Sequence, residues 1–198
     1  MKTRLKAVIS LLSVLCGLGL GWPANAAESE ITIRSSAMRK MLMDQLFVDR
    51  GRYFLLRQSQ CQFAYLESPV VAVAVGRVAI KARLTVHLGG EADGRCAGAG
   101  ESFDVIVSAR PYFSGENIGL TDIRIDDISN EFYRMLLQPF VELALPRALE
   151  INLRQGLESI LARQGASYEV IVGEIRLSSL TAENNAIHGR LSFVLTAR

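Results

Sequence analysis

Two kinds of hydrophobic periodicity divide the chain. Blocks in which apolar and polar residues alternate, as in half-buried β-strands, lie before and after a helical stretch from Asn130 to Gln164. The clearest block runs from Val78 to Leu88, where Val78, Ile80, Ala82, Leu84, Val86 and Leu88 all point to one side. One buried face and one wet face are typical of an antiparallel sheet. The pattern therefore predicts β-meanders on both sides of a helix.

Shorter patterns predict the remaining elements. A helix is expected after Ser35 or Ser36, with an end near Asp49–Gly51, and Gly89–Gly94 is expected to be a flexible connection between strands. The other strands are predicted around residues 53–55, 63–66, 70–75, 103–109, 118–125, 168–177 and 191–195. A slip in the phase of the 118–125 strand indicates a β-bulge.

The helical stretch cannot be one straight helix. Pro139 and Pro146 lack the backbone N–H and clash with the preceding turn, so we expect a broken first part and a second helix that starts with Pro146. Leu149, Leu153 and Leu157 then share one apolar face. Gly156 lies on the same stripe, which suggests either a close approach by another backbone or ligand, or a tolerated helix glycine.

The first 26 residues have the features of a signal peptide. Lys2, Arg4 and Lys6 precede an uncharged apolar run, and Ala24-Asn25-Ala26 offers a cleavage site. We therefore expect export to the periplasm with cleavage after Ala26, and residues 27–198 as one domain. Lipoprotein anchoring at Cys16 is the less favoured alternative, because Leu15 stands where a small residue is expected.

Charge and cysteine content change after this cleavage. Residues 1–26 contain three of the 22 basic residues and none of the 20 acidic ones, so the remaining chain has a net charge of −1. This charge gives no reason to expect nucleic acid as a partner. Only Cys61 and Cys96 remain, and two cysteines in an oxidising compartment predict one structural disulfide.

Residues that carry chemistry are few and scattered. His87 and His188 have no neighbouring cysteine or patterned carboxylate, so no metal site is predicted. No nucleophile, phosphate-binding or dinucleotide motif is present, so no catalytic residue and no cofactor are predicted. The acidic group at residues 122–127 and the basic residues at 77, 81, 83 and 110 are interpreted as solvated sheet surface, with calcium and anionic lipid head groups as the respective alternatives.

Several segments carry a resemblance to a known family. Residues 107–112, residues 119–125 and the helix that ends before Tyr168 resemble the YceB-like family of bacterial envelope proteins, within the tubular lipid-binding superfamily. The resemblance implies an α+β fold in which a highly curved antiparallel β-sheet is wrapped around a long helix in the C-terminal half, with a short N-terminal helix. It also implies an apolar groove for acyl chains. Family members are typically lipoproteins, and this chain lacks a convincing lipobox.

The functional prediction follows from the pattern and the resemblance together. We expect a non-catalytic periplasmic binding or carrier protein for lipid or another hydrophobic ligand, with the membrane surface or envelope proteins as additional partners. The residues expected to line the ligand are Leu84, Val105, Phe140, Leu153, Gly156 and Leu157. The alternative is a structural or interaction protein of the envelope, such as an assembly factor or chaperone, with a solid core. A hydrolase is the least favoured hypothesis.

Overall fold

The structure is a computed structural model that describes residues 27–126, 128, 130–163 and 170–197. The predicted signal peptide and Cys16 lie outside the described residues. The elements, in chain order, are β1 (Ala27–Arg34), α1 (Ser35–Gln45), β2 (Arg52–Ser59), β3 (Gln62–Ala74), β4 (Arg77–Ala92), β5 (Arg95–Ser114), β6 (Asn117–Ile125), α2 (Glu131–Pro139), the π-helix η1 (Phe140–Ala144), α3 (Leu145–Ala148), β7 (Ile151–Asn152), α4 (Leu153–Arg163), β8 (Val170–Glu183) and β9 (Ala186–Ala197).

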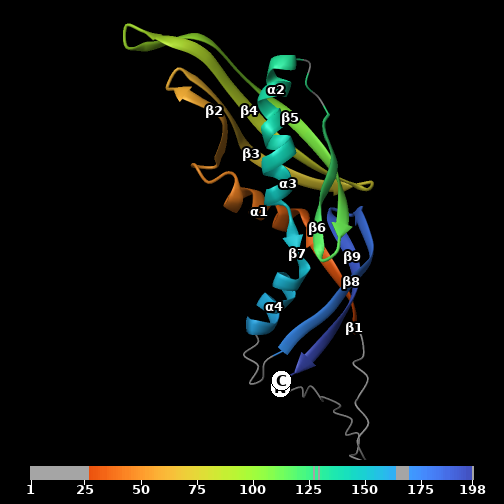
Figure 1. Ribbon diagram of the computed structural model, residues 1–198. Coiled ribbons are helices and arrows are strands. Elements are labelled where there is room, and N and C mark those ends of the chain that lie inside the picture. The colour runs from red at the N-terminus through yellow and green to blue at the C-terminus, as the bar shows by residue number, and fades with distance from the viewer. Residues whose placement is uncertain (1–26, 127, 129, 164–169, 198) are drawn as a thin grey trace, which may run out of the picture.

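The strands form two antiparallel sheets. The larger one has the order β2-β3-β4-β5-β6-β7, and the smaller one has the order β1-β9-β8 (Figure 1). The β3–β4 turn of the larger sheet contacts the β8–β9 turn of the smaller one through two backbone hydrogen bonds. The N–H of Asn185 donates to the Val73 carbonyl at 3.0 Å, and the N–H of Gly76 donates to the Ala182 carbonyl at 2.9 Å. The predicted arrangement of strands before and after a helical region is confirmed.

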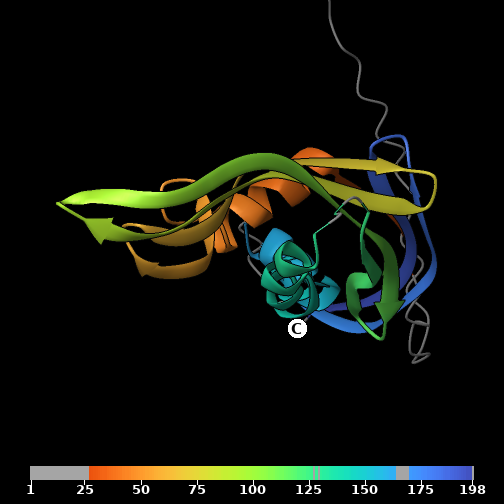
Figure 2. The ribbon, with the colours of Figure 1, turned by 90° about the horizontal axis from the view of Figure 1, so that it is seen from above.

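The main core lies between the curved larger sheet and the helices on its concave side (Figure 2). Every second residue of β4 from Val78 to Val86 is buried, as its alternation predicts. Leu137, Phe140 and Leu145 face these strands from the helical segment α2-η1-α3 and are at most 1% exposed. The structure therefore confirms an α+β fold with a strongly curved antiparallel sheet and an associated helix.

The helical segment continues through both prolines, so the prediction of a new helix at Pro146 is wrong. The Leu145 N–H donates to the Phe140 carbonyl, a π-type bond. This wider turn comes immediately before Pro146, where the proline ring would clash with the preceding turn of an α-helix. The helix instead ends at Ala148. Residues 151 and 152 then pair with β6, and the Asn152 side chain caps α4 by accepting from the Gln155 N–H at 2.9 Å.

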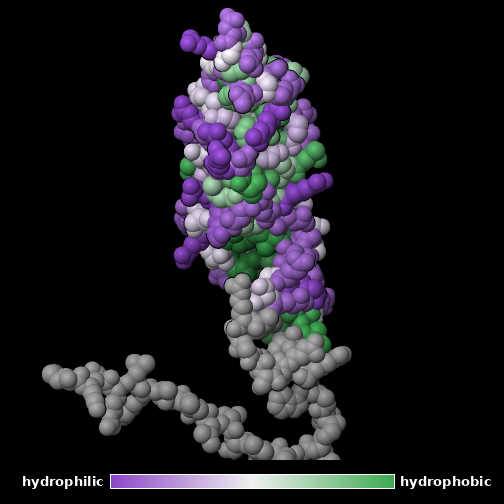
Figure 3. Space-filling view, turned by 90° about the vertical axis from the view of Figure 1, so that its left-hand side faces the viewer, coloured by the Kyte–Doolittle hydropathy of each residue, from purple (hydrophilic) through white to green (hydrophobic). Residues whose placement is uncertain are grey.

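A long hairpin replaces the flexible connection that was predicted over Gly89–Gly94. Strands β4 and β5 stay paired as far as Ala92 and Arg95, and a tight turn joins them at Asp93 and Gly94. Both turn residues have positive φ (52° and 70°), as an Asp-Gly hairpin turn requires. The hairpin extends beyond the rest of the larger sheet (Figure 1), and this end of the molecule is mainly hydrophilic on the face shown in Figure 3.

The predicted disulfide between Cys61 and Cys96 is confirmed, with the two Cα atoms 5.1 Å apart. It joins the short turn between β2 and β3 to the protruding part of β5. Cys61 is buried, whereas Cys96 and its neighbours in the hairpin are exposed. The bond is therefore a link between the hairpin and the body of the sheet.

A second, smaller core surrounds α4. Leu153 packs with Ile118 and with side chains of β8 and β9. Arg154 adds polar contacts to this core. Its guanidinium donates to the Glu116 carboxylate and to the carbonyls of Val172 and Gly173. This group of contacts connects α4, the β5–β6 turn and β8.

Candidate functional site

A groove runs between β6 and the long helix. Strand β7 pairs only with Asn117 and Ile118, and residues 123–125 at the other end of β6 face the helical segment across a cavity of about 500 Å³. We call this cavity the helix groove. It is lined by Ile123, Arg124 and Ile125 from β6 and by Arg134, Gln138, Val141 and Glu142 from the helix.

The helix groove has apolar walls and a polar rim of both signs. Ile123, Ile125 and Val141 supply the apolar part. Arg134 lies at the rim, where it donates to the Ile128 carbonyl at 3.2 Å and pairs with Glu131 at 3.5 Å. Gln138 donates to Glu142 at 2.8 Å on the same side of the helix. This combination suits a ligand with an apolar body and a polar or anionic end.

Arg124, the second cation of the groove, is fixed by Asp122. Its Nε donates to Asp122 Oδ1 at 2.9 Å, and Arg77 donates to Asp122 Oδ2, also at 2.9 Å. Hydrogen bonds from Arg77 and then from Arg124 hold the pKa of the Asp122 carboxyl below its ordinary value. Asp122 has a φ of 49° in the predicted β-bulge, which the register shift opposite Ser108 and Arg110 confirms. The carboxylate stays ionised and orients the arginines around it.

Three of the four basic residues grouped on the sheet surface, at positions 77, 81 and 110, are paired with acids. Arg77 and Arg110 both lie within 3.4 Å of Asp122, and Lys81 pairs with Asp104 at 2.7 Å. The hydrogen bond from Lys81 lowers the pKa of the Asp104 carboxyl. Since the surrounding carboxylates balance much of this positive charge, the surface does not form a strongly cationic patch.

The residues predicted to line a ligand lie in two different cores. Leu84, Val105 and Phe140 belong to the main core and are at most 1% exposed. Leu153 and Leu157 belong to the second core around α4. None of these five lines the helix groove or the pocket described below, so the structure does not bring them together into one of these sites.

Gly156 is exposed, and the prediction that it lies on the buried stripe of its helix is wrong. A Cβ added there would meet no atom of the described residues within 4 Å, so none of their backbone approaches it. Because the helix starts at Leu153 and not at Pro146, Leu149 is not part of it, and Leu153 and Leu157 pack in the second core.

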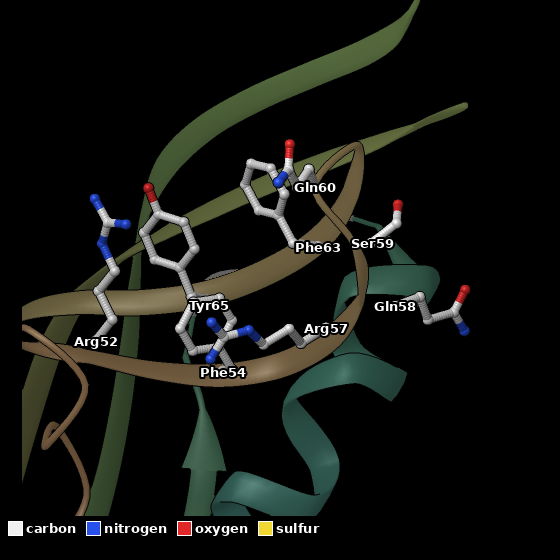
Figure 4. Close-up of a pocket in the computed structure, with 8 residues that line it drawn as sticks. All are labelled: Arg52, Phe54, Arg57, Gln58, Ser59, Gln60, Phe63 and Tyr65. Carbon is white, nitrogen blue, oxygen red and sulfur yellow. The ribbon is translucent and has the colours of Figure 1, made fainter. Parts of the chain in front are cut away.

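A second cavity, of about 380 Å³, lies on the outer face of the β2–β3 hairpin (Figure 4). We call it the aromatic–arginine pocket. Its lining residues are Arg52, Phe54, Arg57, Gln58, Ser59, Gln60, Phe63 and Tyr65. Ala64 and Leu66 point to the core from the same strand that carries Phe63 and Tyr65 outward. The pocket is therefore built on the opposite face of the sheet from the main core.

Flat groups form a continuous row in this pocket. The rings of Phe63 and Tyr65 are stacked with centroids 5.7 Å apart, and Phe54 lies against Tyr65 at 5.6 Å. The guanidinium of Arg52 lies 4.4 Å from the centre of the Tyr65 ring, and that of Arg57 lies 4.5 Å from the centre of the Phe54 ring. These distances are within the range of cation–π contacts, which hold both arginines against the rings.

Contacts behind the pocket fix its turn. The Ser59 Oγ accepts from the backbone N–H of Cys61 at 3.1 Å, and the Cys61 carbonyl lies 2.8 Å from Nδ1 of His87. The His87 ring in turn stacks on Phe63 at 5.7 Å. The disulfide ties the same turn to the hairpin. The pocket is thus held by hydrogen bonds, stacking and one covalent bond.

Sequence reasoning missed both cavities. The strand pattern identified residues 63–66, but apolar residues occupy both faces of β3, so the outward position of Phe63 and Tyr65 was not evident. The available signal was the repetition of aromatic and arginine residues between positions 52 and 65. The groove requires residues from β6 and from the helix, and no local pattern joins them.

The described residues contain no group of three or more His, Cys, Asp or Glu side chains that could hold a metal ion. His87 contacts the Cys61 carbonyl, and His188 lies 3.4 Å from Thr32 Oγ1 and from the Glu30 carboxylate. Within the same part of the chain, no helix is long and apolar enough to cross a membrane.

Comparison of the chain with protein families, with curated proteins and with solved structures gives no match.

Proposed function

We propose that this protein is a non-catalytic, exported binding or carrier protein for a lipid or similar amphiphile, which lies in the helix groove. The observation that carries the proposal is the composition of that groove. Ile123, Ile125 and Val141 supply its apolar lining, and Arg124, Arg134, Gln138 and Glu142 supply polar and charged lining of both signs. An acyl chain fits the apolar lining, and a polar or anionic head group fits beside Arg134.

The size of the groove is consistent with a small amphiphile. Its volume of about 500 Å³ lies within the range of small-molecule sites. Each methylene that leaves water contributes about 0.8 kcal/mol, so ten of them contribute roughly 8 kcal/mol before the costs of association. Apolar burial therefore supplies most of the binding energy, and the polar lining contacts the head group.

The family resemblance supports the same proposal. The YceB-like family and the tubular lipid-binding superfamily combine a curved antiparallel sheet with a long helix, and this chain has a curved sheet with a helix on its concave side. The proposed site nevertheless differs from the expected one. It lies at the edge of the sheet beside β6, whereas the expected residues Leu84, Val105 and Phe140 fill the core.

Two measurements test the proposal. Mass spectrometry of gently purified protein should find a co-purified lipid, and a fluorescent fatty-acid probe should bind and be displaced by that lipid. Ile123→Asn should weaken probe binding, because it places an amide on the apolar wall. Ile106→Asn is the matched control, since Ile106 is 36% exposed and does not line the groove. Absence of both retained lipid and probe binding would refute the proposal.

A second candidate function is an interaction protein of the envelope with a solid core. The observation in its favour is an apolar stripe on the solvent side of the long helix, where Phe132, Met135 and Leu143 are 37%, 57% and 57% exposed. A photo-crosslinker at position 135 should then trap one defined envelope protein, and Leu143→Lys should abolish the crosslink. If the stripe gives no specific crosslink, this alternative fails.

A further inference from the structure

We propose that the aromatic–arginine pocket is a second binding site, which takes a sugar ring bearing a carboxylate or phosphate. The pocket combines three features in one place. Stacked rings offer flat apolar surface, two guanidinium groups lie against those rings, and a short polar turn forms one edge (Figure 4). A pyranose has the complementary shape, with an apolar ring face and a rim of hydroxyl groups.

The ion pairs of Arg52 and Arg57 leave N–H donors with which an acidic group could bind. Arg57 Nη1 donates to Asp49 at 2.8 Å, and Arg52 Nε lies 3.4 Å from Glu67. These ion pairs involve one nitrogen of each guanidinium, and an arginine carries five N–H donors in a planar fork. The cation–π contacts and the ion pairs therefore orient the guanidinium groups, and donors remain for a carboxylate or phosphate.

The β2–β3 turn supplies groups that can form hydrogen bonds with the hydroxyl groups of a sugar. Gln60 carries an amide with both donors and an acceptor, and the Ser59 hydroxyl is placed by its bond from the Cys61 N–H. Because the disulfide and His87 hold Cys61, this edge is already in position before a ligand arrives. A site organised in advance loses less entropy on binding.

Single-stranded nucleic acid also stacks on aromatic rings, but the surroundings argue against it. Nucleic-acid grooves follow the backbone with a continuous series of unpaired cations. Here Arg52 and Arg57, the two cations among the pocket's lining residues, each face an acid. An acyl chain is disfavoured too, because polar and charged side chains surround the rings.

The proposal can be tested by titrating the purified protein and following the aromatic ¹H–¹³C signals of Phe63 and Tyr65. The probes are trigalacturonate, the neutral trisaccharide maltotriose and oligo(dT). Trigalacturonate should bind saturably, and Tyr65→Leu should weaken it roughly tenfold through loss of one stacking ring. Tyr112→Leu, which removes an exposed tyrosine outside the pocket, should leave the affinity unchanged.

Arg57→Gln separates charge recognition from stacking. It should weaken trigalacturonate binding and leave any weak maltotriose binding unchanged. Equal affinity for the two sugars in the parent protein, tighter binding of oligo(dT), or no binding of trigalacturonate would each overturn the proposal. The fatty-acid probe provides an independent readout, because Tyr65→Leu does not alter the helix groove. Failure of one site is therefore distinguishable from failure of the other.

Discussion

Removal of the disulfide should lower the free energy of unfolding, and the length of the loop between Cys61 and Cys96 gives the expected size of this loss. Cys61 and Cys96 are separated by 35 positions, and cross-linking a loop of this length disfavours the unfolded chain by about 4 kcal/mol. The suitable variant combines Cys61→Ala with Cys96→Ala. Alanine avoids placing a hydroxyl at position 61, which is only 4% exposed, and Cys96 is exposed, so little packing is lost there.

The assay is equilibrium unfolding in urea, with the oxidised parent and the parent kept in reducing agent measured alongside the double variant. The free energy of unfolding should fall by about 3–4 kcal/mol in the variant and in the reduced parent. A loss below about 1 kcal/mol, with an unchanged denaturant slope, would refute the loop-closure argument. Hydrogen exchange should also show faster opening of residues 89–100, because their covalent link to the turn at Cys61 is then lost.

Three further predictions concern the main core, the dependence of stability on pH in acid, and the helix α4. Leu84→Ala should lower the free energy of unfolding by about 3 kcal/mol in the urea assay, because Leu84 is fully buried in the main core. The hydrogen bond from Arg154 holds the pKa of Glu116 below its ordinary value of 4.5, so this group stabilises the fold above that value and the contribution is lost as the pH falls through the lowered pKa. Glu116→Gln should therefore flatten the fall in thermal stability below about pH 4.5, and an unchanged acid profile would contradict this. Gly156→Ala should stabilise the protein by up to about 1 kcal/mol, since the position is exposed, helical and open; a destabilised variant would show that Gly156 has a close neighbour after all.

The sheet was predictable wherever one face of a strand is apolar and the other is polar. Strand β4 meets this condition from Val78 to Val86, and its register and burial follow the sequence. Strand β3 does not meet it, because Phe63 and Tyr65 are large apolar residues on the outer face. Alternation therefore located that strand but did not identify its inner side.

The end of the long helix and the length of the hairpin are set by contacts between residues far apart in the sequence, which local patterns do not show. Pro146 normally starts or breaks a helix, but the π-turn that precedes it allows the helix to continue, and pairing of Ile151 with Ile118 sets the actual break. In the hairpin, Gly89 and Gly90 indicated a loop, yet the Asp93–Gly94 turn keeps two glycine-rich strands in register. Long-range pairing outweighed local propensity in both places.

The protruding hairpin also exposes strand edges that other chains could join. Within the described part of the chain, β4 pairs with β3 only as far as Leu88, and β5 pairs with β6 only from Val107 onward. The end of the hairpin, residues 89–100, carries glycines and the charged residues Glu91, Asp93 and Arg95, which are poor partners for intermolecular strand addition. This composition allows the molecule to extend two strands into solvent while remaining resistant to edge-to-edge aggregation.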